Sequence, residues 1–142
     1  MSTSTRKQAT LQDTAVSVRV KLAALWTATL ILFLYGDIIF LWRDGAIRDV
    51  LAGELGPFDI TQGFLLAAAV YVTIPAVMIV LSLVLAPKVN RRSNIVVGAL
   101  YALTIVGSAV GEDWAYYLFL SAVETVLVLL VVRWAWTWPS AG

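Results

Sequence analysis

The sequence predicts an all-α fold: an integral membrane four-helix bundle with a short amphipathic helix in the first outer loop. Two observations lead to this prediction. Hydrophobic residues make up 61% of the 142 residues and charged residues only 13%, about half the share that a soluble domain carries. The chain also contains four apolar segments of the length that crosses a bilayer, about 17 to 25 residues.

The spans are expected at 22–42, 63–86, 95–111 and 114–132, in a single transmembrane domain over 1–142 with a tail at 1–21. Between the first two spans, "AIRDVLAGEL" places its apolar residues on one helical face, which predicts a surface helix over 46–55. Asp59 followed by Gln62 is a variant of the capping box and is expected to open the second span. Asp113 is expected to cap the fourth span.

Basic residues gather on one side of the predicted bundle. Eight of the ten lie in the tail, in the loop "PKVNRRSN" or directly after the last span, and two lie in the opposite loops. Since cytoplasmic loops are enriched in Lys and Arg, we expect a multi-pass protein of the cell inner (plasma) membrane with both termini cytoplasmic. The net charge of +1 does not support nucleic-acid binding.

The chain contains no Cys and no His. Thiol nucleophiles, disulfides, the usual zinc sites and His-ligated haem are thereby excluded. We therefore expect neither a metal nor a cofactor.

Two acidic residues lie inside the predicted spans. Glu124 interrupts the run "SAVETVLVLL" ten residues after Trp114, which places it roughly 15 Å deep, near the bilayer midplane. Asp37 lies roughly 8 Å below the outer interface. The spans contain no Lys or Arg, and an unpaired carboxylate in lipid takes up a proton rather than stay charged. Because intramembrane acids are usually functional, Glu124 and Asp37 are our candidate catalytic residues.

Polar side chains share helical faces with these acids. Pro75 leaves the carbonyl of Tyr71 without its usual helical donor. We expect the inward faces to enclose a cavity lined by candidate substrate-binding residues: Gln62, Tyr71, Thr73, Tyr101, Thr104, Ser108, Trp114, Tyr117 and Ser121. A purely structural alternative stays open, in which protonated Glu124 donates to the Tyr71 carbonyl or to a hydroxyl of the third span.

The stretch "GSAVG" matches the GxxxG pattern through Gly107 and Gly111. This pattern permits close helix contact. The contact would lie either within the bundle or between the subunits of a homo-oligomer.

Four sequence features resemble a known family: "LYGDIIFL" closing the first span, "DITQGFLL" opening the second, "NRRSNIVVG" before the third, and an acid in the fourth. The family consists of small bacterial four-helix membrane proteins whose domain has no assigned function, and the resemblance covers residues 22–138. It implies the fold and transfers no catalytic role. In size and character the chain is also similar to small actinobacterial membrane terpene cyclases, which act on prenylated substrates, although it carries none of their diagnostic motifs.

Three functional hypotheses follow. A protonated carboxyl group in an aromatic-lined pocket suits a proton-initiated terpene cyclase or isomerase that binds an isoprenoid or lipid-like substrate, with Glu124 or Asp37 as general acid. Alternatively, the same acids would exchange protons in a small proton-coupled transporter or channel-forming subunit, which predicts an oligomer. The third hypothesis is an accessory subunit of a membrane complex.

Overall fold

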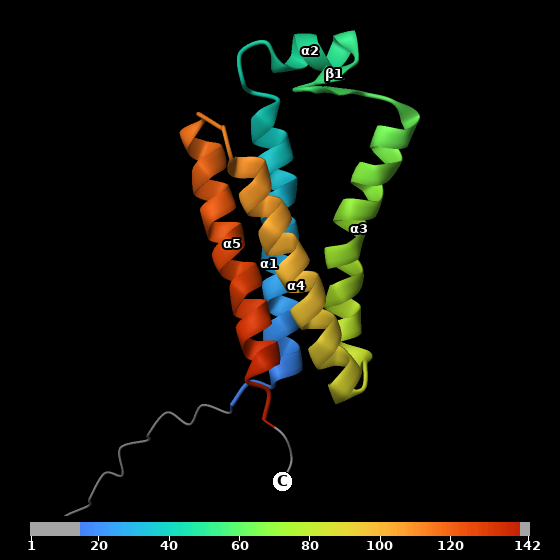
Figure 1. Cartoon of the computed structure of the whole chain (residues 1–142), viewed down its shortest axis with the longest axis vertical. Helices are drawn as coiled ribbons and strands as arrows, with labels where there is room; N and C mark the ends of the chain where they lie inside the picture. The colour runs from blue at the N-terminus through green and yellow to red at the C-terminus, as the bar shows by residue number, and fades with distance from the viewer. Residues whose placement is uncertain (1–14, 140–142) are drawn as a thin grey trace, which may run out of the picture.

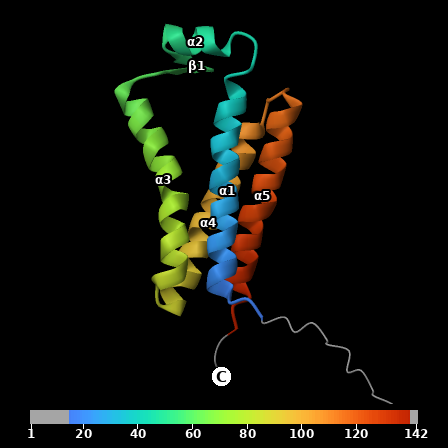
Figure 2. The same ribbon diagram turned by 180° about the vertical axis from the view of Figure 1, so that it is seen from behind.

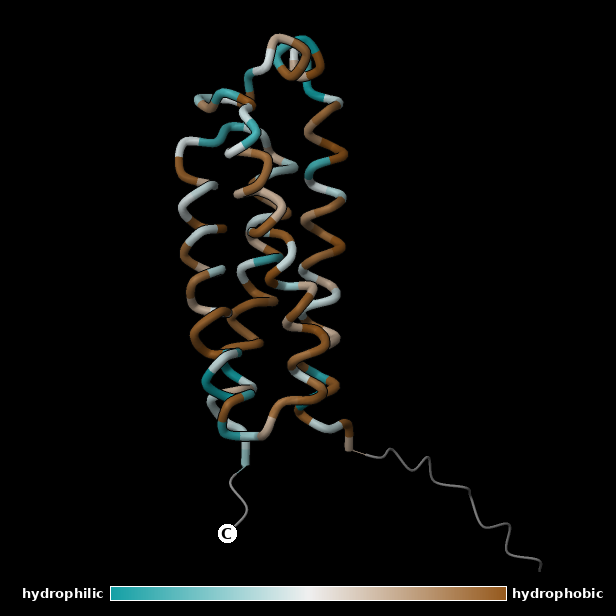
Figure 3. Tube along the Cα trace, turned by 90° about the vertical axis from the view of Figure 1, so that its right-hand side faces the viewer, coloured by the Kyte–Doolittle hydropathy of each residue, from teal (hydrophilic) through white to brown (hydrophobic). Residues whose placement is uncertain are grey.

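The structure, a computed structural model, describes residues 15–139. Four long helices run side by side (Figure 1): α1 (Val18–Phe40), α3 (Gln62–Val84), α4 (Pro87–Ala109) and α5 (Ala115–Trp136). Each is long and apolar enough to cross a membrane. Hydrophobic residues dominate the middle of these helices, and hydrophilic residues gather at both ends of the bundle (Figure 3). The predicted fold class is confirmed, and the chain is a multi-pass membrane protein.

The two ends of the bundle differ (Figures 1 and 2). One end, here called the termini end, carries the start of α1 and the end of α5. The other, the α2 end, is covered by the short helix α2 (Ala46–Ala52) and by an antiparallel hairpin of β1 (Glu54–Leu55) and β2 (Phe58–Asp59). We predicted a helix over 46–55, but α2 stops at Ala52 because Gly53 takes a left-handed φ of 85°. The hairpin was not predicted.

The third span begins earlier than predicted. We placed its start at Ile95, whereas α4 begins at Pro87, so that "PKVNRRSN" forms its first two turns and not a loop. Proline is favoured in the first turn of a helix. Asn90 and Asn94, one turn apart, are fully buried, while Arg91 between them is exposed. The first two turns of α4 are helical and amphipathic, but their low hydropathy does not indicate a membrane span.

The outer helices also extend into segments predicted as flanks. α1 begins at Val18 rather than at residue 22, and α5 continues to Trp136 rather than stopping at 132. Ser17 caps α1 by accepting a hydrogen bond from the backbone N–H of Val20. Part of the predicted polar tail is therefore helical.

Neither of the two predicted capping residues caps its helix. Thr61, not Asp59, caps α3, because its Oγ1 accepts from the backbone N–H of Phe64 at 3.1 Å. The start of α5 has Trp114 as its N-cap residue and no side-chain cap, so Asp113 does not cap it. Glu112 Oε1 instead accepts from the backbone N–H groups of Asp113 and Trp114, directly before the helix.

A polar clamp joins α1, α3 and α4 toward the termini end. We use this name for Trp26, Ser82, Asn90 and Asn94, all fully buried. The Asn94 Oδ1 accepts from Trp26 Nε1 at 2.7 Å and from Ser82 Oγ at 3.2 Å. Asn90 donates to the Ser82 carbonyl, and Asn94 donates to both oxygens of Asn90. Every member thus has partners, as buried polar groups in lipid require.

The packing of α3 is asymmetric along its length. Its buried residues, Pro75, Met78 and Ser82, all lie in its second half. In the first half no side chain is fully buried. Figures 1 and 2 both show α3 diverging from the other helices toward the α2 end. The helix is therefore anchored at the termini end and separated from its neighbours at the other.

Arg43 closes the α2 end between α1 and α5. Its guanidinium donates to Glu112 Oε2 at 2.9 Å and to the Tyr116 hydroxyl at 2.7 Å. The group also lies 5.0 to 5.6 Å from four aromatic ring centres, those of Phe40, Trp114, Tyr116 and Tyr117. Desolvation alone would raise the pKa of Glu112, but the hydrogen bond and the charge of Arg43, together with hydrogen bonds from the backbone N–H groups of Trp114 and Asp113, outweigh it and lower that pKa below its ordinary value.

The closest helix contact involves a different glycine from the predicted pair. A Cβ at Gly98 would lie 2.8 Å from Val132 Cγ2, whereas a Cβ at Gly107 would meet no atom within 4 Å. Gly111 lies beyond the end of α4 in a left-handed conformation. Within the bundle, Gly98 is thus the glycine that lets α4 approach α5.

Gly98→Ala should lower the melting temperature of the purified protein in detergent, because the added methyl group overpacks the α4–α5 contact at a cost of about 1–3 kcal/mol. Gly107→Ala is the matched control and should leave the melting temperature equal or slightly higher, since alanine has the better helix propensity. Equal destabilisation by both substitutions would contradict this packing.

The ion pair of Arg43 with Glu112 should make stability depend on pH. Because the folded state lowers the pKa of Glu112 from 4.5, the pair stabilises fully above that value, and its contribution disappears as the pH falls through the lowered pKa. The melting temperatures of wild type and Glu112→Gln should therefore differ at pH 7 and converge in acid. Glu54→Gln, at an exposed position, serves as control and should show no such convergence.

Candidate functional site

Glu124 lies inside the bundle. It sits in the middle of α5, and its side chain is 7% exposed. Among residues 15–139, its carboxyl group makes neither a hydrogen bond nor an ion pair. Every completely enclosed side-chain nitrogen or oxygen of these residues has a hydrogen-bond partner. Since the carboxyl oxygens of Glu124 have none, they are not completely enclosed. The group is therefore buried and unpaired, with a small exposed surface.

Asp37 is the second carboxyl group of the site. It lies near the α2 end of α1, just under one turn before Phe40, and is exposed. Asp37 belongs to α1 and Glu124 to α5, and these two helices pack against each other. The two acids that the sequence singles out therefore lie on neighbouring helices.

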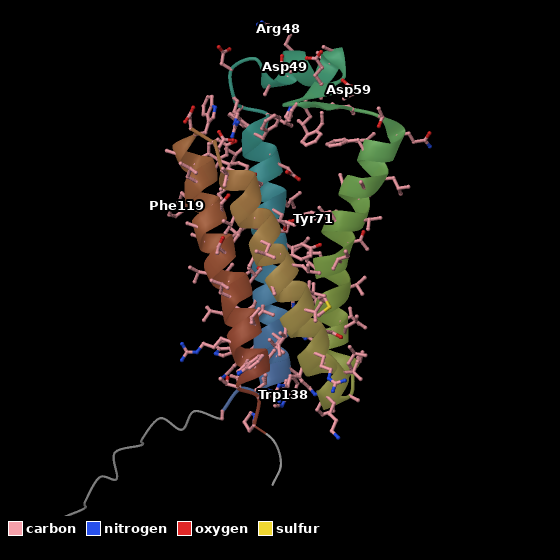
Figure 4. All side chains as sticks on the ribbon, in the orientation of Figure 1. Arg48, Asp49, Asp59, Tyr71, Phe119 and Trp138 are labelled. Atoms are coloured by element: carbon pink, nitrogen blue, oxygen red, sulfur yellow. The ribbon has the colours of Figure 1, made fainter. Side chains whose placement is uncertain are left out.

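Two tyrosines connect α3 to α4 beside this pair. The Tyr101 hydroxyl donates to the backbone carbonyl of Tyr71, the carbonyl that Pro75 deprives of its helical donor. The Tyr71 hydroxyl in turn bonds Thr104 Oγ1 at 2.8 Å. Figure 4 shows Tyr71 in the space between α3 and the other helices. Since these groups bond one another, the structural role considered for Glu124, donation to one of them, is not realised.

Two further polar residues lie on α5 near Glu124. Tyr117 is half-buried and Ser121 is buried, and both share the face of α5 that carries Glu124. All four long helices therefore contribute polar groups to one region.

An aromatic stack forms one wall of the site. The rings of Tyr71 and Tyr101 lie 4.8 Å apart at 25°, and Phe33 of α1 stacks beside both, with ring centres at 5.9 and 6.2 Å. Sequence reasoning missed Phe33 because an apolar aromatic in a membrane span carries no distinguishing signal. Its position four residues before Asp37, on the same helical face, is the one sign that was available.

The remaining predicted residues lie outside this region or at its edge. Gln62 is exposed at the first position of α3. Trp114 packs on Arg43 and is 45% exposed. Thr73 and Ser108 are exposed, and their hydroxyls bond backbone carbonyls of their own helices. The predicted enclosed cavity is thus replaced by an arrangement that is open on the side of α3.

A nonpolar groove of about 420 Å³ runs along α3. Its lining consists of Leu66, Ala69, Val70, Thr73, Ile74, Val77, Met78 and Leu81. Met78 at its edge also belongs to the buried core, but the lining contains neither carboxyl group and no residue of the aromatic stack, so the groove lies along an exposed face of α3. Another hollow, of about 510 Å³, lies at the α2 end between Leu41 and Arg48 and is not lined by either carboxyl group. No group of metal-ligating side chains occurs among the described residues.

Spin labels should reveal the one-sided anchoring of α3. The chain has no cysteine, so paired cysteines at exposed positions can be labelled cleanly: Leu66→Cys with Val106→Cys at the α2 end, and Leu83→Cys with Val89→Cys at the termini end. Double electron–electron resonance should give a broader distance distribution for the pair at the α2 end than for the pair at the termini end. Tyr101→Phe, which removes a hydrogen bond worth about 1 kcal/mol, should broaden it further.

The termini-end pair should keep its width in the Tyr101→Phe background, because the polar clamp is intact there. Tyr35→Phe, at an exposed tyrosine, is the matched control and should change neither distribution. Equal widths at both ends of the wild-type protein would contradict the asymmetric anchoring.

Comparison with known proteins gives a family and no function. No curated protein and no solved structure matches the chain. Residues 14–141, nearly the whole sequence, match a family of unknown function, DUF6326. The chain therefore belongs to the DUF6326 family.

Proposed function

We propose that this membrane protein binds an isoprenoid or similar lipid-like molecule beside α3, and that Glu124 donates a proton to it. The observation that carries the proposal is the state of Glu124, which is buried and has no hydrogen-bond or ionic partner among residues 15–139. A carboxyl group in such surroundings is most stable when protonated. The protonated group then acts as an acid that no structural hydrogen bond occupies.

The surroundings favour a hydrophobic ligand over an ion. The groove along α3 does not include either carboxyl group, but it offers an almost entirely apolar surface to a hydrophobic ligand, and its volume falls in the range of small-molecule sites, about 300–1,000 Å³. The first half of α3 has no fully buried side chain, so a molecule dissolved in the bilayer can approach from the side. Neither Glu124 nor Asp37 is paired with a basic side chain of the described residues that would attract an anion.

The proposed chemistry is an isomerisation or cyclisation that a proton initiates. Protonated Glu124 transfers its proton to one carbon of an alkene, which forms a C–H bond and leaves a cation on the neighbouring carbon. Ionised Asp37 then removes a proton from a carbon next to the cation, which restores a double bond. Transfer of that proton from Asp37 to Glu124 returns both groups to their starting state, so atoms and charges balance.

The aromatic stack supplies the stabilisation that this cation needs. The rings of Phe33, Tyr71 and Tyr101 stack on one another inside the bundle, and a desolvated cation that reaches them would gain up to about 2 kcal/mol from an aromatic face. Hydrocarbon around the bundle keeps bulk water away, so the cation is not quenched before the proton is removed.

Purified protein in lipid discs, incubated with polyprenyl substrates, should yield isomerised or cyclised product by mass spectrometry. Glu124→Gln should lower the rate about 10²–10⁴-fold, the usual contribution of a general acid. Asp37→Asn should also lower it. Asp49→Asn, at an exposed acid of α2, is the matched control and should retain full activity.

Undiminished product from both site variants would refute the acid mechanism. Movement of substrate across vesicles without product, lost in the same two variants, would replace it by the proton-coupled transport considered above. Normal ligand binding and no effect of either substitution would support an accessory subunit instead.

A further inference from the structure

We propose that the termini end of the bundle is a binding surface for the headgroups of anionic phospholipids. This inference is independent of the proposed function. It rests on a set of six basic side chains, here called the basic collar: Arg19, Lys21, Lys88, Arg91, Arg92 and Arg133. They belong to the start of α1, the start of α4 and the end of α5.

The collar has no counter-charge within the described part of the chain. Its eight acidic residues lie either at the α2 end or inside the spans: Asp37, Asp44, Asp49, Glu54, Asp59, Glu112, Asp113 and Glu124. The ion pair that these residues form is that of Arg43 with Glu112, at the opposite end. Mutual repulsion within the collar is therefore not relieved by carboxylates of residues 15–139.

Tryptophans hold half of the collar in place. Arg19 lies 5.9 Å from the ring centre of Trp138, Lys21 lies 5.1 Å from that of Trp134, and Arg91 lies 6.0 Å from that of Trp136. The two arginines also donate to backbone carbonyls near the ends of α3 and α5, at 2.7 and 2.9 Å. These contacts order the side chains without neutralising them.

The other half of the collar is exposed and makes no hydrogen bond or ion pair within residues 15–139. It consists of Lys88 and Arg92 on α4 and Arg133 on α5. Lys88 and Arg92 are four residues apart and so share one face of α4. The first turn of α4 also lacks both an acidic residue and a side-chain cap, which leaves the positive end of the helix dipole uncompensated.

Position and chemistry select a phospholipid as the partner. The collar surrounds the ends of four membrane-crossing helices, and its tryptophans are the residues that sit at headgroup depth in a bilayer. A phosphate group there can accept bonds from an arginine fork and from a lysine. Anionic headgroups attract each nearby Lys or Arg by a further amount that zwitterionic headgroups do not provide. Figure 4 shows Trp138 at this end of the bundle, next to the base of α1.

Native mass spectrometry of the full chain in detergent tests the proposal, with dioleoylphosphatidylglycerol and dioleoylphosphatidylcholine added in equal amounts. We expect preferential binding of phosphatidylglycerol. Each charge removed by Lys88→Gln or Arg92→Gln should weaken it about fivefold, the equivalent of one basic residue at a membrane surface. Binding of phosphatidylcholine should not change.

Arg48→Gln is the matched control, because Arg48 is exposed at the α2 end (Figure 4); it should bind phosphatidylglycerol as the wild type does. Raising the salt concentration from 0.05 to 0.5 M should reduce the preference, since screening weakens exposed charges. Equal binding of both lipids, or an equal loss in Arg48→Gln and Arg92→Gln, would overturn the proposal.

Discussion

Hydrocarbon offers no hydrogen bonds, so each polar group that a helix carries into the membrane must find its partner inside the protein. The polar clamp satisfies this constraint for two asparagines, a serine and a tryptophan at once. The same constraint explains the role of Tyr101. Pro75 frees the carbonyl of Tyr71, and the Tyr101 hydroxyl takes the place of the missing N–H. Against this background of satisfied groups, the unpaired carboxyl group of Glu124 stands apart.

The location of these bonds determines where the bundle is open. The clamp holds the second half of α3 against α1 and α4, where the buried residues of α3 lie, and the Tyr71–Tyr101 bond joins the middle of α3 to α4. The first half is joined to α1 through α2 and the hairpin, whose glycines at 45, 53 and 56 have left-handed backbones. Since α3 is tied at one end, the apolar groove along it and the polar groups beside Tyr71 are accessible from the bilayer.

Hydropathy was sufficient to predict the four spans, because lipid selects apolar residues regardless of packing. It failed at the start of α4, where buried Asn90 and Asn94 alternate with exposed arginines in a helix that looks like a loop. The two acids were predicted as a site because a charge in lipid is conspicuous. Phe33 was not, and the contact at Gly98 was not distinguished from the GxxxG pair, because a sequence does not state which face of a helix meets its neighbour.

Arg43 explains how the acid pair escapes neutralisation. This arginine follows Asp37 by six residues, and a turn back along α1 would bring a cation to the site. Instead, Glu112 and Tyr116 bind the guanidinium, and four aromatic rings surround it. The hydrogen bond to Glu112 and the neighbouring charges outweigh desolvation and raise the pKa of Arg43 above its ordinary value, so the cation is stable where it is. These contacts hold the cation at the α2 end, where it pairs with Glu112 and not with Asp37 or Glu124.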